Sequence, residues 1–390
     1  MGTPKESDTP AATRRDSLGR ERFGSAAPDD ARAPAELREE QAGTFRQFVR
    51  DHRRLFLGLL VAVAGTVFFF AVLPQIAGFG DTVQRLRKGD KSWFLLGVGF
   101  EVLSVLGYVS VFKVTFSCEG VDIGWTESYQ ITMAGIVATK LFAAAGAGGV
   151  ALTAWALRAA GLGARAVGRR MTAFEILLYA VYMGSLVIFG VGLASGLFPG
   201  RAPRALTVVP AAFGAGMIAA VLAFKLLPDD IGRWLQRLSG GSDRRRRLID
   251  RVAAIPNTIH DGLDTAIELV RRPHVSLLGA VAYWGFDIGT LWATFHAFGG
   301  SPSFPVVVMA YLVGTLANVI PIPGGIGGVE GGMIGCFIGF GVNGSTAVLA
   351  VLSYRAISFW LPTLPGAFAY FQLRRTVGRW RAEPEPGAAA

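Results

Sequence analysis

The sequence predicts an all-α membrane protein, a polytopic helical bundle of about six full spans plus two broken, re-entrant hairpins. Hydrophobic residues make up 52% of the 390 residues, more than in ordinary soluble domains, and the mean hydropathy is +0.43. Six apolar runs are long enough to cross a hydrocarbon core of roughly 30 Å as α-helices. Two further apolar regions are rich in glycine and too long for one simple span, so each is expected to hold two shorter legs.

The predicted elements follow one another along the chain. A tail (1–44) with few large apolar residues is predicted to be disordered and cytoplasmic, and no cleavable signal peptide is visible. A transmembrane domain (45–373) contains a cytoplasmic arginine-rich loop (228–274), and a cytoplasmic C-terminal tail (374–390) follows. The six spans are Leu55–Phe79, Trp93–Phe116, Thr172–Phe198, Ala205–Leu227, Val275–Phe298 and Thr346–Leu373; the broken regions are Tyr129–Leu157 and Pro305–Val342.

Charge asymmetry decides the topology. If both broken regions were single crossings, the arginine-rich loop and the Arg158–Arg170 segment would lie outside, against the positive-inside tendency. If each region enters and leaves on the same side, both segments and the C-terminal tail lie inside. The sequence therefore predicts a protein of the plasma (inner) membrane with both termini in the cytoplasm, although Arg85, Arg87 and Lys88 remain outside. A hairpin of two full crossings would also return the chain to the side from which it entered, and would give the same topology for the other segments.

The arginine-rich loop also shows apolar periodicity. Apolar residues recur at helical spacing in two stretches, which fits a pair of short amphipathic helices on the inner surface: Ile231, Leu235 and Leu238, and then Ile255, Ile259, Leu263 and Ile267. A solvated connecting loop is the alternative interpretation.

The second broken region carries the most informative motif, Asn318 to Glu330. Two prolines and a run of glycines cannot continue a helix. At membrane depth, irregular backbone is tolerated only where protein buries it or where it lines a wet cavity. The motif therefore predicts a binding site.

The two broken regions resemble each other. Ala138–Gly149 aligns with Leu316–Gly327: an apolar lead, one polar residue and a run of small residues recur in the same order. Because the first region enters from the inside and the second from the outside, the alignment predicts an inverted repeat. Such repeats place a substrate site at their interface near the midplane.

Ionisable side chains interrupt the apolar segments. Such a group at the bilayer centre costs at least roughly 2.5–3.5 kcal/mol, so it normally faces protein or water. Polar neighbours recur at helical spacing around four of these groups, which predicts a shared hydrated interior. Alternatively the ions pair as structural links, for example Arg355 with Glu330 or Asp287. The ionisable set is Glu101, Lys140, Glu175, Asp287, His296, Glu330 and Arg355; the polar neighbours are Ser104, Tyr108, Tyr179, Tyr182, Tyr283, Thr290, Thr294 and Ser358.

Several chemical motifs are excluded. Gly146–Ala151 fits G-x-G-x-x-A but follows no strand, and Gly324–Gly328 lacks the ending of a P-loop. The four histidines and two cysteines show no ligand spacing, so neither a metal nor another cofactor is expected. Although the net charge is +10, the arginines flank membrane segments, which favours anionic lipid as partner over nucleic acid.

The Pro321–Glu330 stretch, followed by Ser353-Tyr354-Arg355 and Phe359–Pro362, resembles a known family. It is similar to the membrane portion of lysylphosphatidylglycerol synthase/flippase proteins, the multiple peptide resistance factor group, over about Leu55–Leu373. The resemblance implies that the protein moves an anionic or aminoacylated phospholipid between leaflets. It also implies that Pro323, Gly324, Gly325, Gly327 and Glu330 form the second broken element beside Arg355.

The sequence departs from the family pattern at two points, and each limits which family properties we expect in this protein. Ala143–Ala145 stands where a proline is common, so a proline-made break is not expected in the first region. The soluble aminoacyl-transfer domain has no counterpart in this sequence, so we do not expect an enzyme.

These observations combine into a functional hypothesis with two rivals. Arg355, with Lys140, would hold a lipid phosphate, while acids balance charge or contact a cationic headgroup. The rivals are a membrane-embedded enzyme that uses the acids as general acid and base on a lipid or polyprenyl-linked substrate, and an accessory scaffold for cell-envelope enzymes. The expected partners are membrane phospholipids and such envelope enzymes. The predicted pathway residues are Arg355, Asp287, Glu330, Lys140, Glu175, Asn318, Tyr283, Pro323, Gly324, Gly325 and Gly327.

Overall fold

The computed structural model is helical and, over the residues it describes, contains no strand, so the all-α prediction is confirmed. It describes residues 89–117, 121, 123–141, 147–226, 258–272, 274–319, 325 and 327–382. The chain divides into Met1–Arg54 and Leu55–Ala390, and all described residues belong to the second unit. The predicted N-terminal tail, the span Leu55–Phe79, most of the arginine-rich loop and the last eight residues lie outside the described ranges.

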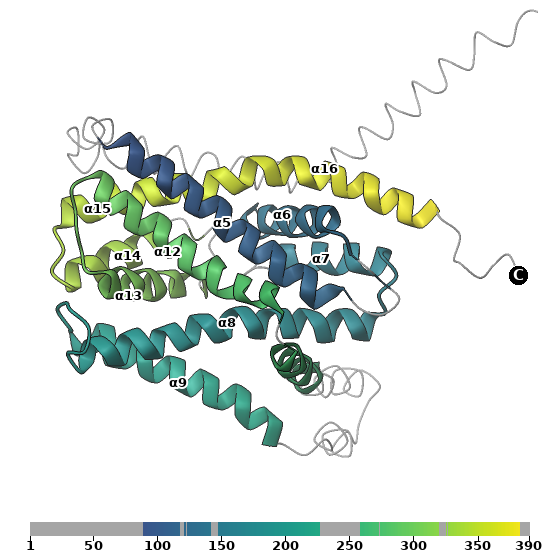
Figure 1. The fold of residues 1–390 in the computed structure, drawn as a ribbon, viewed down its shortest axis with the longest axis horizontal. Helices are drawn as coiled ribbons and strands as arrows, with labels where there is room; N and C mark the ends of the chain where they lie inside the picture. The colour runs from purple at the N-terminus through teal and green to yellow at the C-terminus, as the bar shows by residue number, and fades with distance from the viewer. Residues whose placement is uncertain are drawn as a thin grey trace, which may run out of the picture. The chain divides into compact units, whose positions relative to one another are not determined.

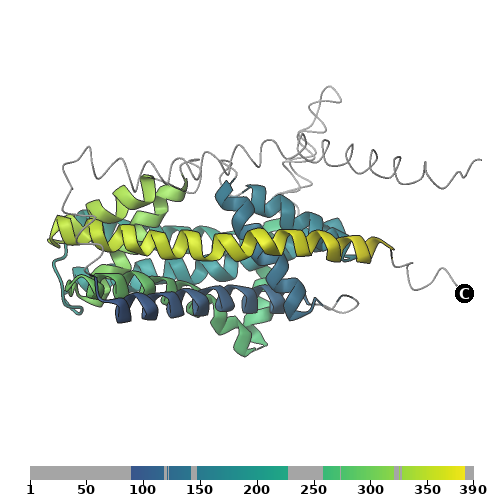
Figure 2. The ribbon, with the colours of Figure 1, turned by 90° about the horizontal axis from the view of Figure 1, so that it is seen from above.

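Long helices match the predicted spans. Among the described residues, four helices are long and apolar enough to cross a membrane. They are α5 (Lys91–Phe116), α8 (Ala164–Ala194), α9 (Arg204–Leu226) and a continuous helix in which α15 (Gly344–Arg355), the π-helix η6 (Ala356–Trp360) and α16 (Leu361–Ala382) follow one another. Figures 1 and 2 show α16, in yellow, running lengthwise along the bundle. The remaining predicted span within these ranges is η3 (Val275–Leu278) followed by α12 (Gly279–Ala297).

Helix α5 begins at a capped end. The Asp90 carboxylate accepts hydrogen bonds from the backbone N–H of Ser92 (2.9 Å) and from its hydroxyl group (2.6 Å). This is a standard way to satisfy the first free N–H groups of a helix. The same bonds lower the pKa of the Asp90 carboxyl, because they favour its charged form.

Helices α5 and α12 pack antiparallel along their full lengths. Gly107 faces Gly279 near one end, Thr290 donates to the carbonyl of Gly97 (3.1 Å), and Asp90 N–H donates to the carbonyl of Ala297 (3.0 Å) at the other end. Small residues let the two backbones approach closely, as is common between membrane helices. Helix α12 therefore traverses the same depth as α5, which agrees with the predicted span.

Gly107→Val is expected to destabilise the protein by about 1–3 kcal/mol, because the added side chain overpacks this contact. A Cβ at Gly107 would lie 2.7 Å from the Gly279 carbonyl oxygen. The measurement is the thermal midpoint in detergent. Gly99→Val is the matched control, since a Cβ there meets nothing within 4 Å on the same helix. Equal losses in the two variants would contradict the packing explanation.

Two hairpins of short helices fill the predicted broken regions. The first consists of α6 (Trp125–Leu141) and α7 (Ala147–Ala159), of 17 and 13 residues. The second consists of α13 (Phe304–Thr315), its extension η4 (Leu316–Val319) and α14 (Gly328–Gly339), with 12 residues in each α-helix. At 1.5 Å per residue these helices reach about 18–26 Å, short of the roughly 30 Å needed to cross. The sequence alignment thus located both breaks.

The hairpins open at opposite ends of the bundle. Near the start of α6, Gln130 accepts a hydrogen bond from Thr376 close to the end of α16 (2.9 Å). At the other end, Gly200 in the turn between α8 and α9 lies against Val306 of α13, and Gly339 of α14 lies against Leu206. In Figure 1, α13 and α14 accordingly lie toward one end and α6 and α7 toward the other. This is the arrangement that the inverted repeat predicts.

A repeated turn supports the duplication. After α7, the N–H of Gly161 donates to the carbonyl of Arg158 (3.2 Å) and the N–H of Leu162 to that of Leu157 (3.1 Å). The same bonds recur 180 residues later, from Gly341 to Ile338 and from Val342 to Phe337, both at 2.9 Å. Each is a Schellman turn, whose glycine needs a positive φ: 99° at Gly161 and 86° at Gly341. The ungapped alignment, with an offset of 178, is therefore two residues out of register after the break.

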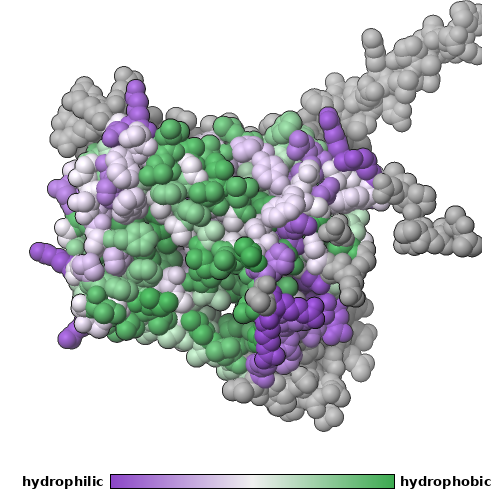
Figure 3. All heavy atoms as spheres, in the orientation of Figure 1, coloured by the Kyte–Doolittle hydropathy of each residue, from purple (hydrophilic) through white to green (hydrophobic). Residues whose placement is uncertain are grey.

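Each hairpin is buried in its own apolar core. Ile131 and Leu157 of the first hairpin pack with residues of α5, α8 and α16. Val307 and Phe337 of the second pack with residues of α8, α12 and α15. Apolar residues cover the middle of the face seen in Figure 3, and hydrophilic residues gather toward its ends, as expected for a protein with a membrane-facing belt.

Basic residues collect at the end where the first hairpin opens. A helix over residues 258–271 corresponds to the second of the two predicted amphipathic helices and packs there with Leu263 and Ala266 buried, whereas the first predicted helix lies outside the described residues. Its Asp261 pairs with Arg165 of α8 (3.0 Å). Among the described residues, the basic residues at this side are Lys113, Arg158, Arg165, Arg169, Arg170, Lys225, Arg271, Arg272, Arg374, Arg375, Arg379 and Arg381, and those at the opposite side are Lys91, Arg201 and Arg204.

Candidate functional site

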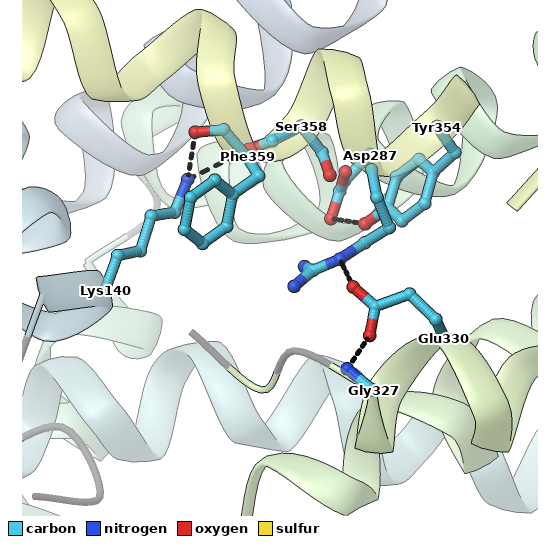
Figure 4. A network of polar contacts seen from close by, with 8 residues as sticks. Lys140, Asp287, Gly327, Glu330, Tyr354, Ser358 and Phe359 are labelled. Atoms are coloured by element: carbon cyan, nitrogen blue, oxygen red, sulfur yellow. Dashed lines mark hydrogen bonds and ion pairs between the residues drawn. The ribbon is translucent and has the colours of Figure 1, made fainter. Parts of the chain in front are cut away.

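The tip of the first hairpin meets the π-helix η6 midway along the bundle. Lys140, at the end of α6, donates from Nζ to the carbonyl oxygens of Ser358 (2.9 Å) and Phe359 (3.1 Å). Its ammonium also lies 5.0 Å from the centre of the Phe359 ring. Figure 4 shows this contact. The sequence explains part of it: Pro362 has no N–H, so it cannot donate to the Ser358 carbonyl four residues earlier.

The tip of the second hairpin approaches the same helix from the other side. Arg355 Nε donates to Glu330 Oε1 (2.6 Å). Glu330 Oε2 accepts from the N–H of Gly327 (2.6 Å), as Figure 4 shows. Glu330 is only 3% exposed, and it stands in the first turn of α14, where the helix dipole favours an acid. The Arg355 guanidinium lies 5.4 Å from the Phe359 ring centre. Phe359 thus lies beside both cations.

Two glycines of the motif have backbone conformations that other residues rarely adopt. Gly325 has φ +64° and Gly327 has φ +89°. A Cβ at Gly325 would also lie 2.3 Å from Asn318 Oδ1, so this glycine allows a close approach of the chain to Asn318. Pro323 and Gly324 lie outside the described residues.

A pair of acids occupies the space between α5 and α12. Asp287 Oδ2 accepts hydrogen bonds from the hydroxyls of Tyr311 (2.5 Å) and Tyr354 (3.0 Å). Glu101 of α5 is 5% exposed, and it lies opposite Asp287, because the Thr290–Gly97 and Ser104–Tyr283 hydrogen bonds join the two helices on either side of the acids. Both acids also interact electrostatically with Lys140. We call the five residues Glu101, Lys140, Asp287, Glu330 and Arg355 the charged cluster.

Sequence reasoning missed the two tyrosines that bond Asp287. Tyr311 is the only aromatic hydroxyl in the strongly apolar helix α13, and this isolation was the available signal. Tyr354 directly precedes Arg355. Both hydroxyls satisfy a buried acceptor, which accounts for their positions.

Other predicted residues are not members of the charged cluster, although Tyr283 lies beside it. Glu175 is exposed on α8, beside Tyr179 and Tyr108. Tyr283 lies one turn before Asp287 and packs against Tyr108, with ring centres 5.0 Å apart. Asn318 is exposed at the end of α13–η4.

Some residues of the predicted polar stripes form hydrogen bonds to backbone carbonyls of their own or a neighbouring helix. Thr290 bonds the carbonyl of Gly97, Ser104 bonds the carbonyl of Tyr283 (2.8 Å), and Thr294 bonds the carbonyl of Leu291 (2.7 Å). Each of these hydroxyls satisfies a backbone acceptor in a buried environment. Across the described ranges, no three His, Cys, Asp or Glu side chains come together as metal ligands.

Comparison with known proteins gives the family. The model of the "Lysylphosphatidylglycerol synthase TM region" matches residues 55–366, a range that contains the whole charged cluster. The chain belongs to this family. As a member of the lysylphosphatidylglycerol synthase transmembrane family, it is a membrane protein, and the resemblance seen in the sequence is confirmed.

Curated relatives of this family member are archaeal. Two from Methanothermobacter thermautotrophicus, each named UPF0104 membrane protein, align along most of the chain. One is 27% identical over 338 residues, 80% of this chain and 95% of its own length; the other is 24% identical over 346 residues, 85% and 96%. A UPF0104 membrane protein from Pyrococcus horikoshii is 33% identical over 106 residues, 27% of this chain and 32% of its own length.

Proposed function

We propose that this protein is a lipid transporter of the plasma membrane that moves the headgroup of an anionic or aminoacylated phospholipid between leaflets. The observation that carries the proposal is the meeting of two short hairpins, from opposite ends, at a buried cluster of mixed charge. Inverted repeats with broken helices place transport sites in this position. Buried ions of both signs at membrane depth also favour a pathway.

Lys140 is suited to hold a phosphate and release it. Its present acceptors are two neutral backbone carbonyls, and a phosphate oxygen would replace them with a charged acceptor. Arg355 lies on the same ring of Phe359, so it would be the second cation along the path. The acyl chains would stay in the hydrocarbon while the headgroup passes the cluster.

The acids would balance the charge of the two cations and contact an amine where the headgroup carries one. No bond is made or broken in this mechanism, so the lipid leaves chemically unchanged and the protein is not an enzyme.

Reconstitution tests the proposal. Purified protein in liposomes with tail-labelled phosphatidylglycerol is expected to speed the exchange of label between leaflets, measured by dithionite quenching, relative to protein-free liposomes. Mass spectrometry of the same lipids is expected to show no new species. New lipid species would favour the enzyme, and unchanged exchange with a co-purifying envelope enzyme would favour the scaffold.

The basic end of the bundle is expected to face the cytoplasm, because positive residues are retained on that side. In a variant without native cysteines, a single cysteine at Arg379 should react with an impermeant maleimide only after the cells are permeabilised. A single cysteine at Arg201, in the turn between α8 and α9, should react in intact cells. The reverse labelling pattern would invert the proposed topology.

A further inference from the structure

The buried acid pair, Glu101 and Asp287, contains two oxygens that no donor reaches. Glu101 Oε2 and Asp287 Oδ1 are buried and have no hydrogen-bond partner among the described residues. The two residues nevertheless lie opposite each other, because the hydrogen bonds from Thr290 to Gly97 and from Ser104 to Tyr283 join α5 and α12 on either side of them. Two ionised carboxylates are both acceptors, so they can pair only through a proton or another cation. A single proton between them would supply the missing donor for this contact.

The charge balance of the cluster points the same way. Glu330 and Arg355 form a neutral pair at 2.6 Å. Lys140 then offsets only one of the two acids Glu101 and Asp287, so the cluster carries one excess negative charge if every group is ionised. Excess charge in a low-dielectric interior is costly, and one bound proton removes it.

Few other groups near the acid pair could supply the positive charge that neutralises it. Lys140 directs its ammonium to the carbonyls of η6, and the tyrosine hydroxyls already donate to the other oxygen of Asp287. The titratable and charged groups near the pair are Lys140 on α6, Tyr283 on α12, Tyr311 on α13, and Tyr354 and Arg355 on α15.

From these contacts we infer that Glu101 and Asp287 form a proton-binding site that couples lipid movement to a proton gradient. This inference rests on the proposed function and names its energy source. The proton enters from water on one side, is shared by the two carboxyl groups, and leaves to water on the other side. With the proton bound, the cluster is neutral and accepts a phosphate at Lys140; without it, the phosphate meets an excess negative charge.

The coupling is reciprocal, so bound phosphate also favours the bound proton. One unit charge at about 10 Å and an effective dielectric constant near 20 changes affinity about tenfold. Anionic lipid is therefore expected to bind more tightly as the pH falls through the range in which the pair takes up its proton.

A spectroscopic experiment tests the proton without any transport. In detergent near neutral pH, the wild-type protein is expected to show the infrared carbonyl band of a buried protonated carboxyl group. Glu101→Gln should remove this band. Glu268→Gln, at an exposed acid that pairs with Arg272, should leave it unchanged. A wild-type protein without such a band, or a band that survives Glu101→Gln, would overturn the inference whatever the protein transports.

A transport experiment tests the coupling. In liposomes with the membrane voltage clamped, an imposed pH gradient is expected to change the wild-type rate of lipid exchange at least about fivefold. Glu101→Gln should move lipid at a rate that the gradient does not alter, and Glu101→Asp, which keeps the carboxyl group, should restore the dependence. Replacing sodium by N-methylglucamine should change neither rate.

The outcomes separate the two proposals. Lipid exchange that ignores the pH gradient, or that requires sodium, would overturn the proton site but keep the transporter. A protonated carboxyl band in a protein that moves no lipid under any gradient would keep the proton site and reject the transporter.

Discussion

Lys140→Met is expected to lower the rate of lipid exchange at least about tenfold while leaving the protein folded. The substitution removes the cation that would hold the phosphate, and charge-assisted hydrogen bonds of this kind contribute about 1.5–3 kcal/mol. The hydrogen-bond partners left behind are two neutral carbonyls of η6, and the acids Glu101 and Asp287 lose only an electrostatic interaction with Lys140. The loss should therefore appear in transport before it appears in stability.

Lys113→Met is the matched control for this experiment. Lys113 also donates to a backbone carbonyl, that of Ile123 (3.3 Å), and also lies over an aromatic ring, that of Trp125 (5.7 Å). It stands at the end of α5, about three helical turns beyond Glu101 of the charged cluster. Its variant is expected to keep the wild-type exchange rate; an equal loss in both variants would show that Lys140 has a merely structural role.

Arg355→Met is expected to give the largest loss of stability, about 3–5 kcal/mol, because it leaves Glu330 buried without its counter-ion. The measurement is chemical or thermal unfolding in detergent, compared with that of wild type. Glu330→Leu combined with Arg355→Met should recover most of that loss, since a buried pair can often be replaced by apolar residues at little cost.

The double variant also separates the two roles that the sequence left open for this pair. If Glu330 and Arg355 are only a structural link, the restabilised double variant should transport lipid like wild type. If Arg355 belongs to the phosphate path, the double variant should be stable and slow. The proposed function requires the second result.

Much of this site could be predicted from the sequence, because glycine, proline and ionisable residues are informative inside apolar segments. The breaks and the opposed hairpins follow from such residues, and the sequence leaves Glu330 and Asp287 as the two alternative partners of Arg355, of which the structure has Glu330. The contact of Lys140 could not be predicted in this way, since its partners are backbone carbonyls of a π-helix rather than side chains. The pattern of side chains in a sequence does not predict which backbone carbonyl of a helix lacks an intrahelical donor.

Other details depended on packing that only three dimensions provide. Glu175 follows the same helical spacing of polar neighbours as Asp287, yet α8 exposes it while α12 buries Asp287 against two tyrosines. Thr290 has the spacing of a pathway residue but links α12 to α5. The spacing of polar residues identifies one face of a helix, but it does not show whether that face packs against the charged cluster.

The contact between Lys140 and η6 has a consequence for how the chain is inserted during synthesis. The ammonium of Lys140 and the carbonyl of Ser358 that receives it are 218 residues apart in the chain. Until the ribosome has made that carbonyl, a lysine at the hairpin tip has no acceptor there, and hydrocarbon penalises it. We therefore expect Lys140 and the hairpin tip to remain near the lipid headgroups, where long basic side chains place their charge. The tip should reach its final depth only after the last helix has been inserted.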